Sequence, residues 1–335
     1  MAKSVRMADI AEKLGVSVVT VSKAINGKEG VGNALRIEIL KTAEEMGYSI
    51  SSSNFANNAS KVVGIINSYL YLEKGSSFYW SLYEKLLRQL TDSDNLCILE
   101  VISQEAQDNL IIPKLIQSKR INALIIMGPF PENYMNMLFS INLPMVILDA
   151  YNAKFPLDSV VSDGYYGMYL MTNYLLERGH RKIGFVGTVG ETSSITDRYY
   201  GYCKAMTEFG LEVTKDMVIP DRSEIGKIQL NLPSDLKNKF TALVCNCDFT
   251  AYEVVKLLPE MGINVPDDLS IVGFDNYILS EVSPVQLTTY AVDQQKMAVE
   301  SIAQLFERIQ NPVKKRDLRM VSGNIIERDS VKSLI

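Results

Sequence analysis

Few residues of this chain could do acid–base, nucleophilic or metal chemistry. His180 is the single histidine, and its place in the turn-like stretch ERGHRK predicts a structural hydrogen bond. Cys245 and Cys247 form a pair, but a zinc site takes four ligands and the chain offers no second cysteine pair. No phosphate-binding loop, nucleophile elbow or dinucleotide fingerprint appears, and one histidine leaves few acid–base arrangements outside carboxylates. We therefore expect no metal, no cofactor and no enzymatic activity.

The composition is that of a folded globular protein with unevenly distributed charge. Of 335 residues, 47% are hydrophobic and 22% are charged, which excludes disorder over most of the chain. Residues 1–61 have a net charge of +2, whereas the chain as a whole has −5. A mildly basic first segment permits a nucleic-acid-binding head. At about 100 to 200 residues per domain, the length predicts two or three folding units.

Neither secretion nor membrane insertion is expected. The start MAKSVRMADIAEK has acidic residues where a signal peptide needs an apolar run, and four cysteines are too few for a disulfide framework. The longest apolar stretches, such as residues 123–127, are far shorter than the roughly 18 to 20 residues that cross a bilayer. We therefore expect a cytoplasmic protein that makes no contact with a membrane.

The spacing of apolar residues changes along the chain. Residues 6–47 have helical spacing and no proline, which predicts three short helices. Residues 49–60, SISSSNFANNAS, are polar and typical of a linker. From residue 62, short apolar runs alternate with amphipathic segments, which indicates parallel sheets covered by helices on both faces. In such sheets, ligands bind beyond the carboxyl ends of the strands.

Residues 9–26, DIAEKLGVSVVTVSKAIN, predict a helix, a turn and a second helix, which is the helix-turn-helix arrangement. Gly15 suits the left-handed conformation that ends the first helix. Ser17 can cap the second helix by accepting a hydrogen bond from the amide of residue 19 or 20. The side chains expected to face one another are those of Ile10, Ala11, Leu14, Val16, Val21 and Ile25.

The outer side of the second helix combines apolar, basic and short polar residues. Exposing the side chains of Val18 and Val19 to water costs free energy, but thymine methyl groups in the major groove offer them an apolar partner. Lys23, one turn later, can reach a guanine edge or a phosphate. The short polar residues that suit phosphate contacts are Thr20, Ser22 and Asn26. The alternative is a generic small helical domain whose surface valines are incidental.

Several motifs resemble the lactose-repressor (LacI/GalR-type) family, in that family's order. Residues 6–48 are similar to its DNA-binding head, with D-[IV]-A, G-V-S, T-V-S, a closing Asn and a final G-Y. The later motifs are ERGHRKIGFVG at 177–187, Arg198 and Gly201 in DRYYGY, VPDDLSIVGFD at 265–275, and PVQLTTY at 284–290. The resemblance covers about residues 4 to 329.

The resemblance implies an all-α helix-turn-helix head at 1–48, a hinge at 49–61, and an effector-binding and dimerisation domain at 62–335. That domain would be an α/β body of two Rossmann-like lobes, as in type I periplasmic sugar-binding proteins. In the head, Val18, Val19 and Lys23 would read bases. The residues implied to contact phosphates are Ser17, Thr20, Ser22 and Asn26. The hinge lacks the family's leucine, so either Phe55 is the minor-groove wedge or the segment is a flexible tether.

The resemblance also implies a sugar effector in the cleft between the lobes. Arg198 offers a fork of donors for two hydroxyls or a carboxylate, and the aspartates accept from hydroxyls. Trp80, beside Phe78, could stack on a sugar face or belong to the core. Cys247 replaces an asparagine that many relatives have. Four of the predicted effector-binding residues follow apolar strands: Ser68, Arg198, Asp248 and Asp275. Three more are Phe78, Trp80 and Cys247. The last two, Asp163 and Arg222, are chosen by aligned position.

The chain is identified as a member of this family, so we expect a cytoplasmic transcriptional regulator, a repressor, switched by a mono- or oligosaccharide. It would bind a pseudo-palindromic operator in double-stranded DNA as a homodimer, because one short helix offers too few base contacts for affinities of about 10⁻⁸ to 10⁻¹¹ M. The chain shows no extended C-terminal heptad repeat, which favours a dimer over a tetramer. Two alternatives are a cytoplasmic sugar-binding protein with an impaired head and a sugar-processing enzyme.

Overall fold

The structure is a computed structural model that describes residue 5 and residues 7–25, 30–46, 61–72, 78–223, 226–277 and 283–335. The chain divides into two compact units. The first contains residues 1–60 and 306–315, and the second contains residues 61–305 and 316–335. The predicted linker at 49–60 lies outside the described residues.

The first unit contains the three predicted helices, α1 (Met7–Leu14), α2 (Val18–Ile25) and α3 (Asn33–Glu45). Gly15 ends α1 with a φ of 64°, in the left-handed region that favours glycine. The amide of Thr20 donates to Ser17 Oγ over 3.0 Å, so Ser17 caps α2 as expected. The buried core consists of Ile10, Ala11, Val21, Ala24, Ile25, Ile39, Leu40 and Ala43. Leu14 and Val16 pack against it partly buried.

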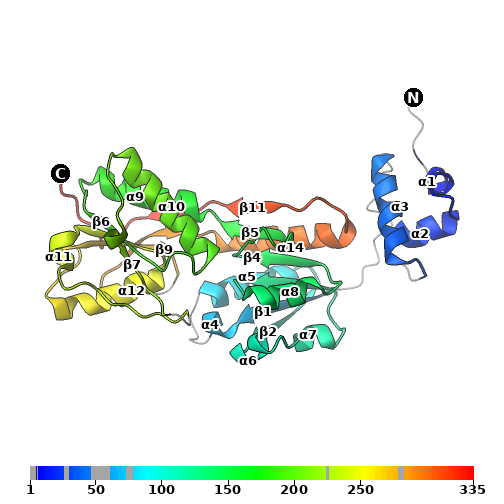
Figure 1. Ribbon diagram of the computed structural model, residues 1–335, viewed down its shortest axis with the longest axis horizontal. Coiled ribbons are helices and arrows are strands. Elements are labelled where there is room, and N and C mark those ends of the chain that lie inside the picture. Colours follow the sequence, from blue (N-terminus) through cyan, green and yellow to red (C-terminus); the bar gives the residue numbers. More distant parts are fainter. Residues whose placement is uncertain are drawn as a thin grey trace. The chain divides into compact units, whose positions relative to one another are not determined.

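The second unit contains two six-stranded sheets, one in each lobe (Figure 1). The sheet of the first lobe is parallel throughout and has the order β11-β5-β4-β3-β1-β2. Its strands are β1 (Val62–Ser68), β2 (Leu96–Ile102), β3 (Ala123–Met127), β4 (Met145–Leu148), β5 (Asp158–Ser162) and β11 (Leu318–Val321). Its helices are α4 (Tyr69–Leu72), α5 (Phe78–Thr91), α6 (Gln104–Asp108), α7 (Lys114–Gln117) and α8 (Glu132–Phe139).

The sheet of the second lobe has the order β12-β10-β9-β8-β6-β7, and only β12 is antiparallel to its neighbour. Its strands are β6 (Ile183–Val186), β7 (Val218–Ile219), β8 (Ala242–Cys245), β9 (Ser270–Asp275), β10 (Thr288–Ala291) and β12 (Asn324–Ile326). The α-helices that follow β5 and the strands of this sheet are α9 (Gly164–Glu177), α10 (Ser193–Glu208), α11 (Leu236–Lys239), α12 (Asp248–Leu257) and α14 (Gln294–Gln310). The described connections also contain two short 3₁₀ helices, Lys215–Met217 and Leu258–Met261.

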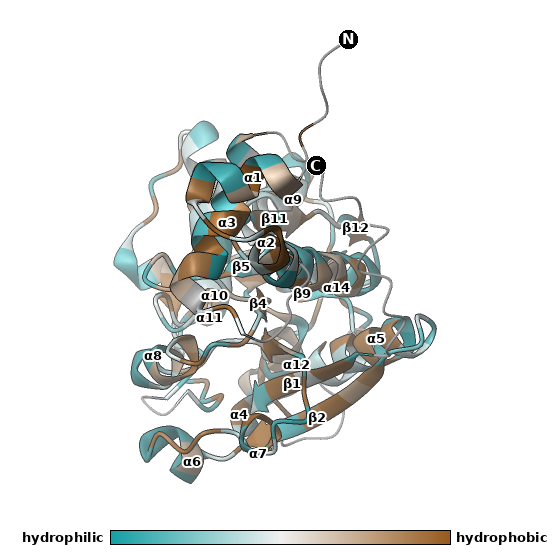
Figure 2. Ribbon diagram, turned by 90° about the vertical axis from the view of Figure 1, so that its right-hand side faces the viewer, coloured by the Kyte–Doolittle hydropathy of each residue, from teal (hydrophilic) through white to brown (hydrophobic). Residues whose placement is uncertain are grey.

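Burial of the strands on both faces explains why their sequences do not alternate between apolar and polar residues. Every residue of β3, β4 and β9 is buried, because helices cover both faces of a parallel sheet. Figure 2 shows β1 and β2 largely hydrophobic, whereas α5 carries both hydrophobic and hydrophilic residues. The edge strand β2 departs from this pattern, since Leu96 and Ile98 are exposed. The predicted class, a helical head with two α/β lobes, is confirmed.

The chain passes between the two lobes three times. It first crosses from β5 to α9, returns from β10 through α14 to β11, and crosses again from β11 to β12. Each sheet therefore takes one edge strand from the last 20 residues of the chain. Within the described ranges, none of the helices combines the length and the apolar character needed to cross a bilayer.

Helices α9 and α10 approach each other closely at Gly201. A methyl group added at this glycine would lie 2.1 Å from the carbonyl oxygen of Tyr165. Because that oxygen belongs to the backbone of the neighbouring helix, it cannot swing away as a side chain would. This contact explains why a glycine follows Arg198 by three residues in the motif of the sequence.

We expect Gly201→Ala to lower the free energy of unfolding by about 3 kcal/mol or more, because the two helices must separate. Thermal unfolding of the full-length protein measures this effect. The matched control is Thr207→Ala on the exposed end of α10, which should stay within about 0.5 kcal/mol of the parent. Equal melting temperatures for Gly201→Ala and Thr207→Ala would contradict the close approach.

Candidate functional site

The outer face of α2 is the candidate DNA-reading surface. Val18 is 47% exposed and Val19 is 63% exposed, and Lys23 is exposed as well. Residues 19 and 23 are four positions apart and therefore lie on the same helix face, away from the buried Val21. Ser17 is exposed beside them, and its hydroxyl lies 2.8 Å from that of Thr20.

The structure leaves part of the predicted DNA contact surface undescribed. Thr20 and Ser22 are half-buried on α2. Asn26 and Phe55, which were predicted to contact a phosphate and to enter the minor groove, lie outside the described residues. The DNA-reading roles of all these residues remain predictions.

A cavity of about 400 Å³ lies between the two lobes of the second unit. It is lined by residues that follow the carboxyl ends of strands in both sheets, where ligands of open α/β sheets bind. The first lobe contributes Leu70, Tyr71, Phe78, Tyr79 and Asp149. The second lobe contributes Thr192, Ser194, Ile195, Arg198, Arg222, Gly226, Lys227, Ile228, Asn246, Cys247, Phe249, Asp275 and Tyr277.

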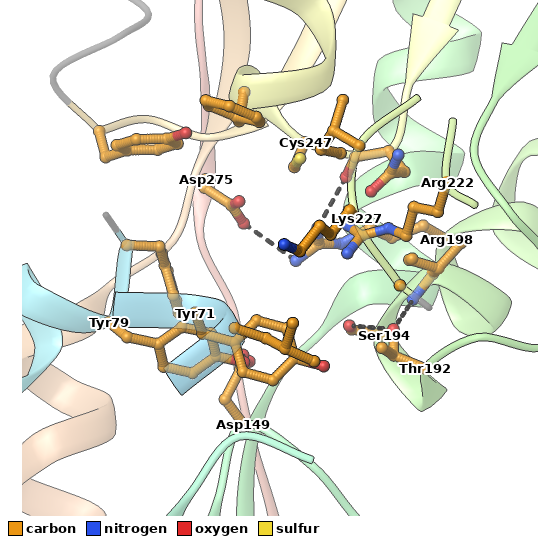
Figure 3. A pocket seen from close by; sticks show the side chains of 18 residues that line it. Tyr71, Tyr79, Asp149, Thr192, Ser194, Arg198, Arg222, Lys227, Cys247 and Asp275 are labelled. Atoms are coloured by element: carbon orange, nitrogen blue, oxygen red, sulfur yellow. Dashed lines mark hydrogen bonds and ion pairs between the residues drawn. The ribbon is translucent and has the colours of Figure 1, made fainter. Parts of the chain in front are cut away.

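Five of the nine predicted effector-binding residues line this cavity. They are Phe78, Arg198, Arg222, Cys247 and Asp275. The structure therefore brings together residues that are almost 200 positions apart in the sequence. Figure 3 shows Arg198, Arg222 and Asp275 on one side of the cavity and Tyr71, Tyr79 and Asp149 on the other.

The other four predicted residues do not line the cavity, and their polar atoms have partners elsewhere. Ser68 Oγ accepts a hydrogen bond from Gln107 Nε2 over 3.0 Å. The indole N–H of Trp80 donates to the carbonyl of Leu72 over 3.2 Å. Asp163 caps α9 by accepting from the amide of a tyrosine in its first turn.

Asp248 is the fourth predicted residue that does not line the cavity. It is the first residue of α12, and its side chain points toward the sheet instead of into the cavity. Thr289 Oγ1 donates to its Oδ1 over 2.6 Å, and the amide of Tyr277 donates to its Oδ2 over 3.3 Å. Gly273 makes room for this carboxyl, since a methyl group there would lie 2.1 Å from Asp248 Oδ1.

Arg198 and Asp275 form the central polar pair of the cavity. Arg198 Nη2 donates to Asp275 Oδ1 over 2.9 Å, and Nη1 donates to the carbonyl of Asn246 over 2.7 Å. The guanidinium lies over the ring of Phe274 at 3.9 Å from its centroid. Although the side chain of Arg198 is only 5% exposed, its Nε has no hydrogen-bond partner. A ligand acceptor in the cavity would satisfy this donor.

Asp149 and Asp275 are carboxylates held on opposite walls by unusual backbone. Asp149 follows β4 with a φ of 65°, and Asp275 ends β9 with a φ of 106°. Such conformations cost non-glycine residues about 1 to 3 kcal/mol each and are found where function holds a side chain in place. The hydroxyl of Tyr79 donates to Asp149 Oδ2 over 2.8 Å. Both carboxyls thus present acceptors to one cavity.

Burial shifts the pKa of these carboxyls upward. Burial raises the pKa of Asp149, which the Arg198 charge and the Tyr79 hydrogen bond only partly offset. Burial likewise raises the pKa of Asp275 from 3.8 to about 7, against the opposing effect of Arg198. The folded protein therefore holds a proton on Asp275 more tightly than the unfolded chain does.

A pH-dependent contribution to stability follows from the pKa of Asp275. The contribution is complete below the unfolded pKa of 3.8 and is lost as pH rises through the folded value of about 7. We expect the melting temperature of the parent to fall relative to that of Asp275→Asn between about pH 5 and pH 8. Thermal unfolding of both proteins across this range measures the difference. Parallel curves would contradict the raised pKa.

Sequence reasoning overlooked several residues of the cavity. Asp149 directly follows the apolar run PMVIL, so the same rule that selected Asp275 could have found it. Tyr71 and Tyr79 lie on either side of residues 73–77, which the structure does not describe. Lys227 lies beyond β7, whose two residues are too few to form a recognisable apolar run.

His180, the single histidine of the chain, has structural partners. His180 is buried, and its two ring nitrogens lie 3.0 Å from Thr241 Oγ1 and 3.0 Å from the carbonyl of Lys332. The structural hydrogen bond predicted for this histidine is thus confirmed. Among the residues that the structure describes, no group of three or more His, Cys, Asp or Glu side chains could hold a metal ion.

Two known protein families match the chain. Residues 6–51 match the family described as bacterial regulatory proteins, lacI family. Residues 172–331 match the periplasmic binding protein-like domain. The HTH-type transcriptional repressor PurR of Histophilus somni (strain 129Pt) is 28% identical over 333 residues, which span 97% of this chain and 98% of that repressor.

Solved structures share the fold along the whole chain. The transcriptional regulator CelR in complex with cellobiose has a TM-score of 0.68 at 19% identity, covering 97% of this chain and 99% of CelR. The lac repressor dimer bound to operator and the anti-inducer ONPF has a TM-score of 0.65 at 20% identity, covering 99% of this chain and all of that one. At sequence identities of 19% and 20%, the structural similarity shows that the fold is shared.

The helix-turn-helix head, the two-lobed body and the relatives that match along their full length all indicate the same class of protein. The chain belongs to the lacI family of bacterial regulatory proteins, and it is a DNA-binding transcriptional regulator. Members of this family are regulators and not enzymes, which agrees with the expectation drawn from the sequence.

Proposed function

We propose that the protein is a cytoplasmic repressor that binds a pseudo-palindromic operator as a homodimer and is switched by a sugar in the inter-lobe cavity. The observation that carries the proposal is that the cavity around Arg198 and Asp275 takes its lining from both lobes. A ligand that touches both lobes binds one of their arrangements more tightly than another. It can therefore shift the equilibrium between them by its differential affinity, typically about 1 to 3 kcal/mol.

The chemistry of the cavity supports a sugar as the ligand. A sugar needs acceptors and donors for its hydroxyls, which Asp149, Asp275 and the Arg198 fork supply. It also needs apolar surface for its C–H faces, and aromatic rings supply that surface. The rings that line the cavity are Tyr71, Phe78, Tyr79, Phe249 and Tyr277. The cellobiose bound by CelR, a protein of the same fold, supports this assignment.

A second copy of the chain is the proposed partner. The exposed Leu96 and Ile98 lie on the edge strand β2, and an apolar edge strand is prone to association. Two heads related by two-fold symmetry would double the base contacts of a single α2 helix. The lac repressor, which shares this fold, is a dimer on its operator.

Selection of genomic fragments tests the proposal. The full-length protein would be mixed with fragments of the source genome at near-physiological salt, beside a matched control protein that begins at Val62. We expect the full-length protein alone to enrich one or a few two-fold symmetric sites, and a sugar to change their affinity. Sugar binding without any enriched site would favour a sugar-binding protein with an impaired head.

A further inference from the structure

Two cations of the cavity are left without an acidic hydrogen-bond partner. The Nε of Arg222 is buried and donates to no acceptor, and the side chain is only 14% exposed. Its nearest acid is Asp221, whose Oδ1 lies 3.5 Å from Nε without a hydrogen bond. Lys227 is exposed at the cavity and makes no ion pair with any residue in the described part of the chain.

Asp221 offsets part of the charge of Arg222 but does not accept a hydrogen bond from it, because other donors occupy its oxygens. The amide and the hydroxyl of Thr188 donate to its Oδ1 over 2.9 and 3.1 Å. Asn246 Nδ2 and Thr250 Oγ1 donate to its Oδ2 over 2.6 and 2.7 Å. Four donors match the about four acceptor sites of a carboxylate. Asp221 thus anchors the segment that carries Arg222, and the guanidinium remains available to a ligand.

A tight turn holds Arg222 and Lys227 on the same wall. The amide of Ser223 donates to the carbonyl of Lys227 over 2.9 Å, and residues 222 and 228 form an antiparallel bridge. Gly226 has a φ of 72°, which the turn requires. Both cations therefore enter the cavity from the second lobe, opposite Tyr71, Tyr79 and Asp149 (Figure 3).

Of the other charged side chains around the cavity, none in the described part of the chain forms an ion pair with Lys227. Asp275 is paired with Arg198, and Asp149, on the opposite wall, accepts a hydrogen bond from the hydroxyl of Tyr79. Glu191 is a further acid that acts on Arg222, and it is exposed to solvent, where its effect is screened. The first turn of α10, a helix of 16 residues, also lines the cavity and adds the positive end of its dipole.

We propose that the effector is a sugar with an anionic group, a phosphate or a carboxylate, and that Arg222 and Lys227 bind this group. The inference rests on the proposed function, in which a sugar occupies this cavity. Arg198, Asp275 and Asp149 then bind hydroxyls, and the anionic group lies against Arg222 and Lys227. The geometry suits an anion because Arg222 offers a fork of donors and Lys227 a mobile point charge.

Titration calorimetry with the full-length protein tests this inference. The probes are glucose 6-phosphate and ribose 5-phosphate, the sugar acids gluconate and glucuronate, and the neutral parents glucose and ribose. The variants are Arg222→Gln and Lys227→Gln. The matched control is Lys296→Gln, which removes an exposed lysine of α14 outside the cavity.

We expect either the sugar phosphates or the sugar acids to bind. The neutral parent sugar should bind at least about tenfold more weakly, because it cannot make the charge-assisted hydrogen bonds of the anionic group. Each cavity variant should weaken binding of the anionic sugar by about ten- to hundredfold, and the control by less than about twofold. The identity of the class distinguishes phosphate from carboxylate.

Two results would overturn the inference alone: equal binding of a neutral parent, or unchanged affinity of both cavity variants for the anionic sugar. If no probe binds, both this inference and the sugar assignment of the proposed function fail. Operator selection by the same protein preparation is measured separately, so the DNA-binding part of the proposed function is tested independently of the ligand.

Discussion

Replacing Val19 with aspartate is expected to weaken operator binding by more than about a hundredfold without lowering the stability of the protein. Val19 is 63% exposed on the outer face of α2, so its replacement leaves the core of the head intact. In a major groove, the new carboxylate would lose the apolar contact and meet the phosphate charges of both strands. Operator binding is measured with the fragment that the parent protein enriches.

Stability separates this prediction from simple unfolding. An acidic residue in the first turn of a helix is favourable by about 0.3 to 1 kcal/mol, so the melting temperature of Val19→Asp should not fall. The matched control is Val189→Asp, at an exposed valine of the body, which should leave operator affinity unchanged. Parent-like operator binding by Val19→Asp would remove α2 from the DNA interface.

Replacing Arg198 with alanine is expected to reduce affinity for the ligand by at least about a hundredfold, because a buried charge pair loses one partner. The change removes two hydrogen bonds, leaves the Asn246 carbonyl without its donor, and deprives Asp275 of its cation. Operator binding should persist, so the variant would occupy its operator without responding to the ligand. Ligand titration and operator binding of the same preparation measure the two effects.

Arg198→Lys serves as the conservative variant for this site. Lysine keeps the charge but lacks the planar fork that reaches Asn246 and Asp275 at once, so we expect an intermediate loss of ligand affinity. The circular dichroism spectra of both variants show whether the fold is retained. Ligand binding by a folded Arg198→Ala within about tenfold of the parent would exclude Arg198 as a main contact.

The head could be predicted closely because its determinants are local. Gly15 and Ser17 act on backbone groups a few residues away, and the apolar residues of α1 and α2 recur at helical spacing. The sequence therefore predicted the turn, the cap and most of the buried residues of α1 and α2. The contacts that such a head makes with DNA depend on a partner that its own packing does not reveal.

The cavity could be predicted only in part, because a residue's position after a strand does not set the direction of its side chain. Asp275 ends β9 and Asp248 follows β8 in the second sheet, yet only Asp275 lines the cavity. Asp248 begins a helix, and the phase of that helix together with the space beside Gly273 turns the carboxyl away. Lys227 depends on a turn whose backbone hydrogen bonds have no simple sequence signal.

The three passages of the chain between the lobes mean that neither lobe corresponds to a continuous stretch of the gene. A truncation after β5 would remove β11 and leave the backbone edge of β5 unpaired, which invites aggregation. A reporter domain spliced into the body, or a split of the body into two complementing fragments, would have to preserve β11 and β12 near the end of the reading frame. We therefore expect that recombination between the genes of related regulators exchanges the body as one unit that contains both lobes.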